Sequence, residues 1–103
     1  MPTLQNQVVL VVGASSGIGR ETAALFAREG ARVMASARRS ERLRDLQSES
    51  SKRGHAIEFS PADAAKPEEM ARLAEETRSR LGTIDILVYA TRAHSAGCRD
   101  QQF

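Results

Sequence analysis

A short aliphatic run that ends in a glycine-rich turn constrains the fold of this chain more than any other feature. Residues 7–12 read Gln-Val-Val-Leu-Val-Val, and Gly13-Ala-Ser-Ser-Gly-Ile-Gly19 follows directly. A β-branched run without polar alternation is typical of a strand buried on both faces, as in parallel sheets. A helical pattern then starts at Ile18. The chain is therefore predicted to begin with a strand, a glycine-rich turn and a helix.

The predicted first helix has one hydrophobic side and a marked end. Ile18, Thr22, Leu25 and Phe26 share a face at helical spacing. By the usual amphipathic pattern, this is the face expected to pack on the rest of the protein. Gly30 follows Glu29 and closes the segment, as a C-terminal glycine commonly does.

Strands and helices continue to alternate along the chain. The further predicted strands cover residues 32–37, 56–59 and 84–90. Ser40 is the expected N-cap of a second helix, which runs through Leu46 and fades in the polar residues 48–54. Pro67 stands at the first position of a third, amphipathic helix that Gly82 stops. The order β-α-β-α-β-α-β implies an α/β fold with a parallel sheet and right-handed crossovers.

Each glycine of the first turn has a physical role in a phosphate-binding loop. Gly13 permits a tight turn off the strand, Gly17 removes a Cβ where a pyrophosphate approaches the backbone, and Gly19 allows close helix packing. The start of the helix offers free N–H groups and a partial positive charge. A P-loop is excluded because Ile18 occupies the position of its second glycine.

The turn is therefore predicted to hold the phosphates of a dinucleotide. The alternative is a glycine-rich turn without a ligand, but the strand before it and the helix after it favour the binding site. The predicted binding residues of this turn are Gly13, Ser15, Ser16, Gly17, Ile18 and Gly19.

Two arginines follow the second strand, where a ribose-binding acid usually stands when the ligand is NAD. The sequence there is Ala37-Arg38-Arg39, with no acid. Guanidinium groups match a phosphate in charge and geometry. Arg38, with Arg39 as second choice, is predicted to bind the 2′-phosphate of NADP(H), so that NADP(H) is preferred over NAD(H). The alternative is a pair of surface arginines at a helix start.

Four landmarks in order give the chain a family resemblance over about residues 5–90. Residues 12–19 resemble the TGxxxGIG signature of the short-chain dehydrogenases/reductases, with Val12 in place of the usual Thr. Residues 35–39, 60–63 and 82–88 resemble three later landmarks of the family. The resemblance implies a Rossmann-type three-layer fold with a four-stranded parallel sheet, which is part of a doubly wound domain. It also implies hydride transfer between NADP(H) or NAD(H) and an alcohol/carbonyl pair.

The resemblance assigns two further cofactor contacts. Asp63 falls where the family has an Asp that binds the adenine amino group. Its alternative is a carboxylate that only stabilises a turn. Ala90 falls where the family's backbone lines the ribose on the nicotinamide side. Residues 1–90 are accordingly predicted to form the cofactor-binding half-domain, and residues 91–103 an irregular tail.

The chain departs from the family pattern after the fourth strand. It reads Tyr89-Ala-Thr-Arg92 where the family usually has Asn-Asn-Ala-Gly. The family's catalytic Ser and Tyr-x3-Lys lie further downstream, and Tyr89 is the only Tyr, with Ala at position 93. No catalytic residue is therefore predicted. The chain is expected to be an enzyme fragment that is inactive alone, a non-catalytic NADP(H)-binding module or sensor, or a poorly folding bystander.

Charge and cysteine content limit the other partners. The net charge is only +2, and the arginine-rich run at residues 38–44 is short and lacks aromatic neighbours, which disfavours nucleic acid. His94 and Cys98 alone do not make a metal site. With one cysteine, no signal peptide at residues 1–7 and no membrane-length apolar run, the expected location is the cytoplasm. The apolar fourth strand would form an unpaired edge, through which we expect self-association.

Overall fold

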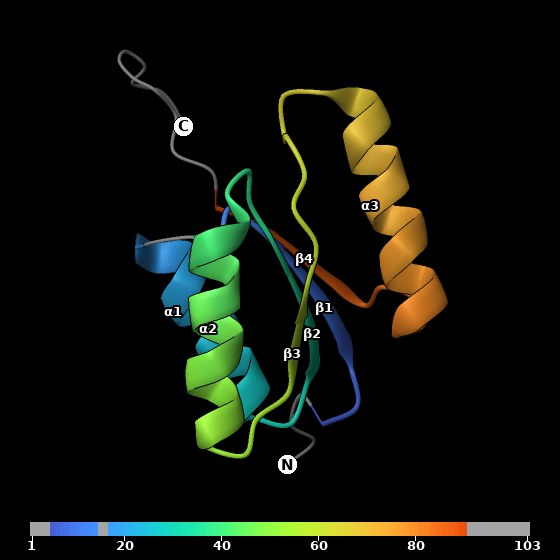
Figure 1. Ribbon diagram of the computed structural model, residues 1–103. Helices are drawn as coiled ribbons and strands as arrows, with labels where there is room; N and C mark the ends of the chain where they lie inside the picture. The colour runs from blue at the N-terminus through green and yellow to red at the C-terminus, as the bar shows by residue number, and fades with distance from the viewer. Residues whose placement is uncertain (1–4, 15–16, 91–103) are drawn as a thin grey trace.

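The computed structural model describes residues 5–14 and 17–90, and its elements alternate as the sequence predicts (Figure 1). Ser15, Ser16 and the predicted tail at residues 91–103 lie outside the described residues. The elements are β1 (Val8–Val12), α1 (Gly17–Arg28), β2 (Arg32–Ser36), α2 (Ser40–Lys52), β3 (Ile57–Phe59), α3 (Pro67–Arg80) and β4 (Ile86–Tyr89). The predicted α/β order is confirmed.

The four strands form one parallel sheet in the order β3-β2-β1-β4. β1 is central: Val9 pairs with Val33 of β2 on one side and with Ile86 of β4 on the other. Every residue of β1 is buried, which explains why its sequence shows no polar alternation. The chain steps from β1 outward to β2 and β3, and then crosses back to add β4 on the opposite side of β1.

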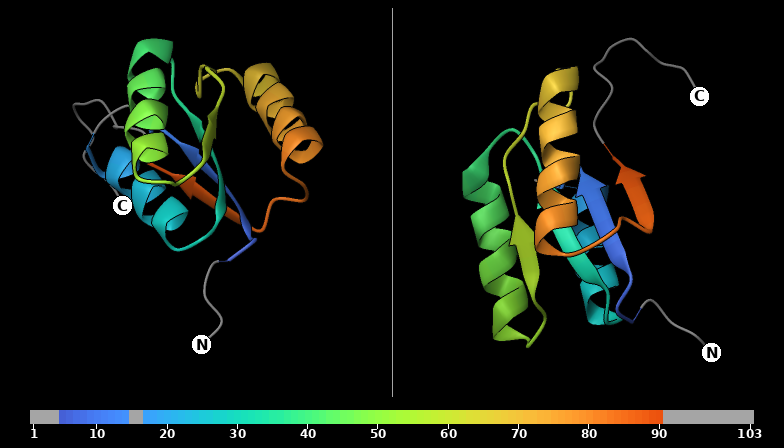
Figure 2. Two further views of the ribbon diagram at one scale, coloured as in Figure 1. Left: turned by 60° about the horizontal axis from the view of Figure 1, so that its bottom comes forward. Right: turned by 90° about the vertical axis from the view of Figure 1, so that its right-hand side faces the viewer.

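Helices cover both faces of the sheet, so the molecule has three layers (Figures 1 and 2). α1 and α2 lie on one face and α3 lies on the other. Alternate side chains of β1 supply the two cores, with Val9 and Val11 toward α1 and α2, and Leu10 and Val12 in the cluster that includes Leu73 of α3. The predicted three-layer arrangement is thus confirmed.

The packed face of α1 differs from the predicted one. Ile18 is 78% exposed and Leu25 is 45% exposed, so neither residue belongs to the buried core. The buried residues of the helix are instead Gly19, Ala23 and Ala27. These small residues recur at every fourth position. Ala23 and Ala27 belong to the core cluster that includes β1 and β2, and Gly19 lies against the turn after β1. Of the predicted face, Phe26 packs partly against the core.

Several boundaries of the elements also differ from the sequence prediction: β2 ends at Ser36 rather than at residue 37, and β3 begins at Ile57 rather than at residue 56. Ser40 is not the N-cap of α2, because the cap position is Arg39 and no side chain caps the helix there. The helix does not fade after Leu46 but continues to Lys52. β4 runs from Ile86 to Tyr89 rather than from residue 84 to 90. Just before it, the backbone N–H of Val8 donates to Asp85 Oδ2 at 2.9 Å.

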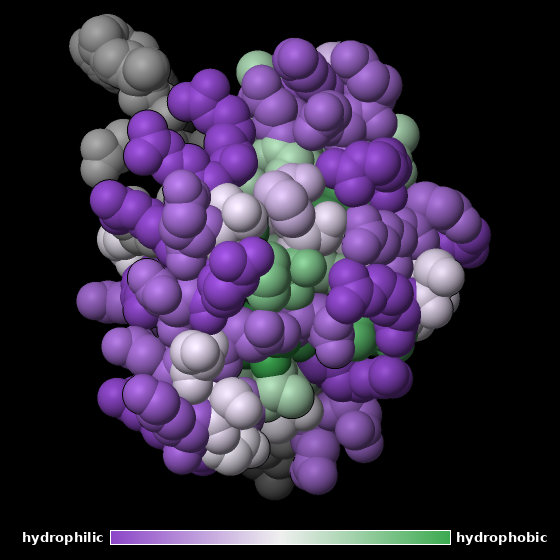
Figure 3. Space-filling view, in the orientation of Figure 1, coloured by the Kyte–Doolittle hydropathy of each residue, from purple (hydrophilic) through white to green (hydrophobic). Residues whose placement is uncertain are grey.

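The two edges of the sheet are covered to different degrees. Along β3, the Gln47 side-chain amide donates to the backbone oxygen of Ile57 at 2.8 Å. Figure 3 shows apolar residues in a narrow strip between the hydrophilic surfaces of α2 and α3. On β4, Leu87 is 61% exposed and Tyr89 is 58% exposed. β4 therefore exposes two large hydrophobic side chains, on a strand that has a partner on one side only among the described residues.

Candidate functional site

The turn after β1 is held tightly against the end of β2. The backbone N–H groups of Gly13 and Ala14 both donate to the Ser36 backbone oxygen, at 2.7 and 2.9 Å. Gly13 has a φ of 91°, a conformation that favours glycine. The turn is thus fixed by backbone contacts, and Gly13 makes the tight departure from the strand that the sequence predicts.

Gly19 allows the first turn of α1 to pack on this loop. A Cβ at Gly19 would lie 2.0 Å from the Gly13 backbone oxygen and 3.2 Å from the Ala14 Cα. No side chain fits at these distances. The close approach predicted for Gly19 is therefore present, but the neighbour is the backbone of the β1–α1 turn rather than the sheet.

Gly17 differs from Gly19 because no atom of the described residues crowds it. Its φ is 62°, and a Cβ built there would meet nothing within 4 Å in residues 5–14 and 17–90, apart from its chain neighbours. The residue begins α1, where backbone N–H groups lack partners within the helix and the helix dipole is positive. No acidic residue occupies the first turn of α1. The combination offers an anion both space and hydrogen-bond donors.

The carboxyl ends of the strands meet beside this turn. In the sheet register Val12 pairs with Ser36 on one side and with Tyr89 on the other. The backbone N–H of Ala90 donates to the Val12 backbone oxygen at 2.8 Å. The strand order changes direction at β1, so this edge is the topological switch point where ligands of α/β sheets bind. Ala90 and the glycine-rich turn therefore lie at the same edge.

A buried hydroxyl group at this edge lacks a partner. The Ser36 Oγ atom is fully buried and makes no hydrogen bond within the described part of the chain. Unsatisfied buried polar groups are rare in folded proteins, and bound water or ligand commonly satisfies them. Ser36 is the last residue of β2, directly before Ala37 and Arg38.

Arg38 and Arg39 are both exposed just beyond β2. Among residues 5–14 and 17–90, neither guanidinium group forms an ion pair. Arg20 of α1, in contrast, pairs with Glu49 of α2 at 2.9 Å. The two arginines after β2 are therefore available to an anionic ligand at the carboxyl edge of the sheet.

Asp63 lies on a segment that prolongs β3 along β2. The Ser60 N–H donates to the Ala35 backbone oxygen at 3.0 Å, and the Ala62 N–H donates to the Ala37 backbone oxygen at 2.9 Å. This pairing brings Asp63 next to the chain that leaves β2. The Asp63 Oδ1 atom accepts a hydrogen bond from the Ala65 backbone at 3.0 Å. The turn-stabilising role considered from the sequence is therefore present in the structure.

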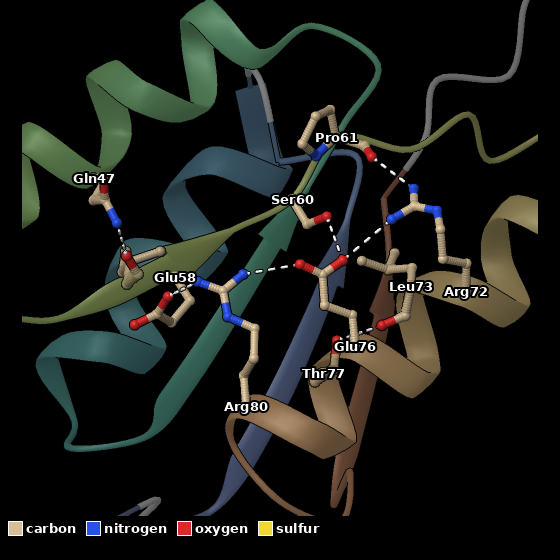
Figure 4. Close-up of polar contacts among 10 residues, drawn as sticks. Gln47, Glu58, Ser60, Pro61, Arg72, Leu73, Glu76, Thr77 and Arg80 are labelled. Carbon is tan, nitrogen blue, oxygen red and sulfur yellow. Dashed lines mark hydrogen bonds and ion pairs between the residues drawn. The ribbon is translucent and has the colours of Figure 1, made fainter.

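A network of charged side chains behind Asp63 was missed by the sequence reasoning. Figure 4 shows five of its members, which come from β3, the segment after it and α3: Glu58, Ser60, Arg72, Glu76 and Arg80. Glu69 of α3 joins them through its ion pair with Arg72 at 3.8 Å. The sequence shows that neighbouring members on α3 are three or four residues apart, as in ion pairs along one helix: Glu69, Arg72, Glu76 and Arg80. It does not show which residues of β3 and the following segment they contact, because those contacts depend on how α3 packs on the sheet.

The described residues contain neither a metal cluster nor a membrane span. Within residues 5–14 and 17–90, no group of three or more His, Cys, Asp or Glu side chains is placed to hold a metal ion. No helix in that part of the chain is long and apolar enough to cross a bilayer.

The family model for short chain dehydrogenases matches residues 7–102. The chain belongs to this family. The match extends past residue 90, where the motif resemblance ends. An A-factor type gamma-butyrolactone 1'-reductase (1S-forming) of Streptomyces virginiae is 42% identical over 94 residues, which are 91% of this chain and 36% of the reductase.

Solved structures of family members share the fold. L-Sorbose reductase from Gluconobacter frateurii, complexed with NADPH and L-sorbose, superposes with a TM-score of 0.83 and 32% identity, over 93% of this chain and 37% of the reductase. A metagenomic short-chain oxidoreductase in complex with NADP gives a TM-score of 0.77 and 34% identity, over 82% of this chain and 38% of that one. The chain thus spans about two-fifths of the length of these proteins.

Replacing Gly19 with Ala tests the close contact at the turn. On helix propensity alone, Gly19→Ala would stabilise α1 by about 1 kcal/mol. We expect the reverse, a loss of about 1–3 kcal/mol in the free energy of unfolding, because the methyl group meets the Gly13 backbone oxygen. Circular dichroism during chemical denaturation measures the change.

Gly54→Ala is the control for this substitution. Its methyl group meets nothing within 4 Å, and φ there is 83°, so it reports the strain of positive φ alone, about 1–2 kcal/mol. A Gly19→Ala protein that is as stable as the parent or more so would contradict the packing described.

Proposed function

We propose that the chain binds a nicotinamide dinucleotide across the carboxyl edge of its sheet, with the pyrophosphate at the turn of residues 13–19. The observation that carries the proposal is the space that the described residues leave at Gly17, beside the first N–H groups of α1, which have no acceptor within the helix itself. The switch point in strand order falls at the same place. Ser15 and Ser16 complete the proposed loop from outside the described residues, and Ile18 follows at the exposed start of α1.

The solved relatives support the class of ligand. Three solved structures of family members were determined with NADP or NADPH, including an actinorhodin polyketide ketoreductase that is 36% identical. Short-chain dehydrogenases as a family bind nicotinamide dinucleotides. The family therefore supports such a ligand, and the choice between NADP(H) and NAD(H) rests on this chain's own residues.

Arg38 is proposed to make NADP(H) the preferred cofactor, with Arg39 as the second candidate. Both guanidinium groups are exposed at the end of β2 and have no ion-pair partner within the described residues. The position is the one at which an acid would bind the ribose of NAD, and a 2′-phosphate would find opposite charge there instead.

Asp63 and Ala90 are proposed to contact the two ends of the cofactor. Asp63 would accept a hydrogen bond from the adenine amino group, and the Ala90 backbone would line the ribose on the nicotinamide side. Both residues follow strands at the carboxyl edge of the sheet. Residues 1–90 would then be the cofactor-binding unit and residues 91–103 would lie outside it, in a protein that we place in the cytoplasm.

Hydride transfer between the cofactor and a small carbonyl or alcohol is the proposed activity of a full-length enzyme of this kind. These 103 residues contain one Tyr and no Tyr-x3-Lys. We therefore propose that the chain alone is inactive. The second candidate function, a cofactor-binding module or sensor, is favoured by the same combination of a nucleotide-binding edge and missing acid/base residues.

An NADPH oxidation assay tests the proposed inactivity. The purified 103-residue chain is expected to give no sustained loss of NADPH absorbance with a panel of aldehydes and ketones, because its sequence has no Tyr-x3-Lys pair to protonate the product alkoxide. Turnover that co-purifies with the chain, and that Gly19→Ala abolishes, would contradict this expectation.

The exposed edge of β4 is the proposed route to self-association. Leu87 and Tyr89 are more than half exposed beside an edge that can pair with another strand. Sedimentation velocity is expected to show dimers or larger species that diminish in Leu87→Lys, since a charge on an edge strand opposes pairing. A parent chain that sediments as a monomer at all accessible concentrations would refute the proposal.

Arg38→Ala tests cofactor preference directly. Removing one charge-assisted contact of about 1.5–3 kcal/mol is expected to weaken NADPH binding by about ten- to a hundredfold. NADH affinity should remain within about twofold, because NADH has no 2′-phosphate. Isothermal titration calorimetry with both nucleotides measures the two dissociation constants.

Arg53→Ala is the matched control, because Arg53 is an exposed arginine at the opposite end of α2. It removes the same charge without touching the proposed site, so its effect on both nucleotides should be small. Equal affinities of the parent for NADPH and NADH, or equal losses in the two variants, would show that Arg38 does not set the preference.

A further inference from the structure

The segment that carries Asp63 is held from two sides. On one side, its backbone pairs with β2 through Ser60 and Ala62. On the other side, it meets α3, which packs on the sheet through the buried side chain of Leu73. Figure 4 shows the side chains of α3 pointing across to Glu58, Ser60 and Pro61. The conformation of the segment therefore depends on α3 as well as on the sheet.

Two side chains of α3 bind the backbone of this segment. The Glu69 Oε1 atom accepts a hydrogen bond from the Asp63 N–H at 2.9 Å. The Arg72 Nη2 atom donates to the Pro61 backbone oxygen at 2.9 Å. These contacts lie on either side of Ala62, which is itself buried. Glu69 therefore fixes the peptide that enters Asp63, the residue with the proposed adenine contact.

Glu76 connects the remaining charges of the network. Its Oε1 atom accepts hydrogen bonds from Ser60 Oγ at 2.8 Å and from Arg72 Nη1 at 3.1 Å. Its Oε2 atom pairs with Arg80, which also pairs with Glu58 of β3. These side chains are about one-third to one-half exposed, so each ion pair adds little stability by itself. The network restricts the position of Arg72 more than it strengthens the fold.

Both sides of residue 63 are thus fixed before any ligand binds. Glu69 holds its N–H, and its own Oδ1 atom is held by the Ala65 N–H. Within the described residues, the second carboxylate oxygen, Oδ2, has no hydrogen-bond partner. A preset acceptor of this kind discriminates between bases, because it attracts an amino group and repels a carbonyl oxygen.

We propose that Glu69 is a positioning residue that orients Asp63 and thereby sets the preference of the site for adenine. This inference rests on the proposed cofactor function and on the adenine contact of Asp63. Glu69 does not touch the ligand but acts through the Asp63 peptide. Its loss therefore reduces affinity for ligands that carry an amino group at this position, while ligands that carry an oxygen there are affected little.

The test compares NADPH with its hypoxanthine analogue, in which an oxygen replaces the adenine amino group. Dissociation constants are measured calorimetrically for the 103-residue parent chain and for Glu69→Ala, Asp63→Ala and the double variant. Glu75→Ala is the matched control, because Glu75 lies on the same helix and pairs only with Arg78, three residues along it, among the described residues. It removes the same charge without contacting the segment.

The expected result is a selective loss in Glu69→Ala. NADPH affinity falls by about three- to tenfold, part of the full contribution of a charge-assisted hydrogen bond, and affinity for the analogue stays nearly constant. In the Asp63→Ala background, Glu69→Ala has no further effect on NADPH, because the two residues act as one unit. Glu69→Gln, which keeps an oxygen acceptor for the Asp63 N–H, retains the preference.

Three results would overturn the inference. If Glu69→Ala weakens the binding of NADPH and of its analogue equally, Glu69 has only a structural role. If its two affinities match those of Glu75→Ala, Glu69 has no role in binding. An unchanged adenine preference in Asp63→Ala would remove the contact through which Glu69 acts, although NADPH binding itself would stand. If Glu69→Ala fails to fold, Glu69→Asp keeps the charge but shortens the side chain, and full retention of the preference in that variant overturns the inference.

A parent chain that binds neither nucleotide would be a different failure. It would remove the proposed cofactor function, and this inference with it. Because NADPH binding by the parent is measured before the variants are compared, the failure of the function and the failure of the positioning role give separate results.

Discussion

The contact between the start of α1 and the turn after β1 is the constraint on which the rest of the site depends. Gly19 lies so close to the Gly13 backbone oxygen that no other residue fits there. The same turn is bound to β2, because the backbone N–H groups of Gly13 and Ala14 both donate to the Ser36 backbone oxygen. The first helix, the central strand and its neighbour are thus joined through backbone atoms. As a result, the N–H groups at the start of α1 are directed at the carboxyl edge of the sheet.

The other parts of the candidate site reach the same edge through strand pairing. Because all four strands are parallel, the residues that follow β1, β2 and β4 lie side by side. The extension of β3 along β2 adds Asp63, and α3 holds it through Glu69 and Arg72. The proposed site for phosphates, ribose and base would thereby be assembled from short segments distant in sequence. The matched part of this chain corresponds to about two-fifths of the length of these relatives.

The sequence predicts the order and type of every described element, because the buried strands and the amphipathic third helix have clear periodicities. It mispredicts the packed face of α1, where the small residues Gly19, Ala23 and Ala27 are buried instead of Ile18 and Leu25. The spacing of large hydrophobic residues does not reveal such a face, because small residues are buried where the helix backbone lies close to its neighbours. The network around Glu76 could not be predicted either, since its partners on β3 are set by the docking of α3. Roles of individual cofactor-binding residues stay predictions.

Amide chemical-shift mapping of the 103-residue chain with NADPH tests the central claim most directly. The account predicts the largest shifts at Gly13, Gly17 and Gly19, at Arg38 and around Asp63, with little change at the opposite ends of the strands. It also predicts that NADH leaves the Arg38 amide nearly unshifted while still perturbing the glycines. No shifts at saturating NADPH, or shifts confined to surfaces away from the carboxyl edge of the sheet, would contradict the claim that this edge binds the cofactor.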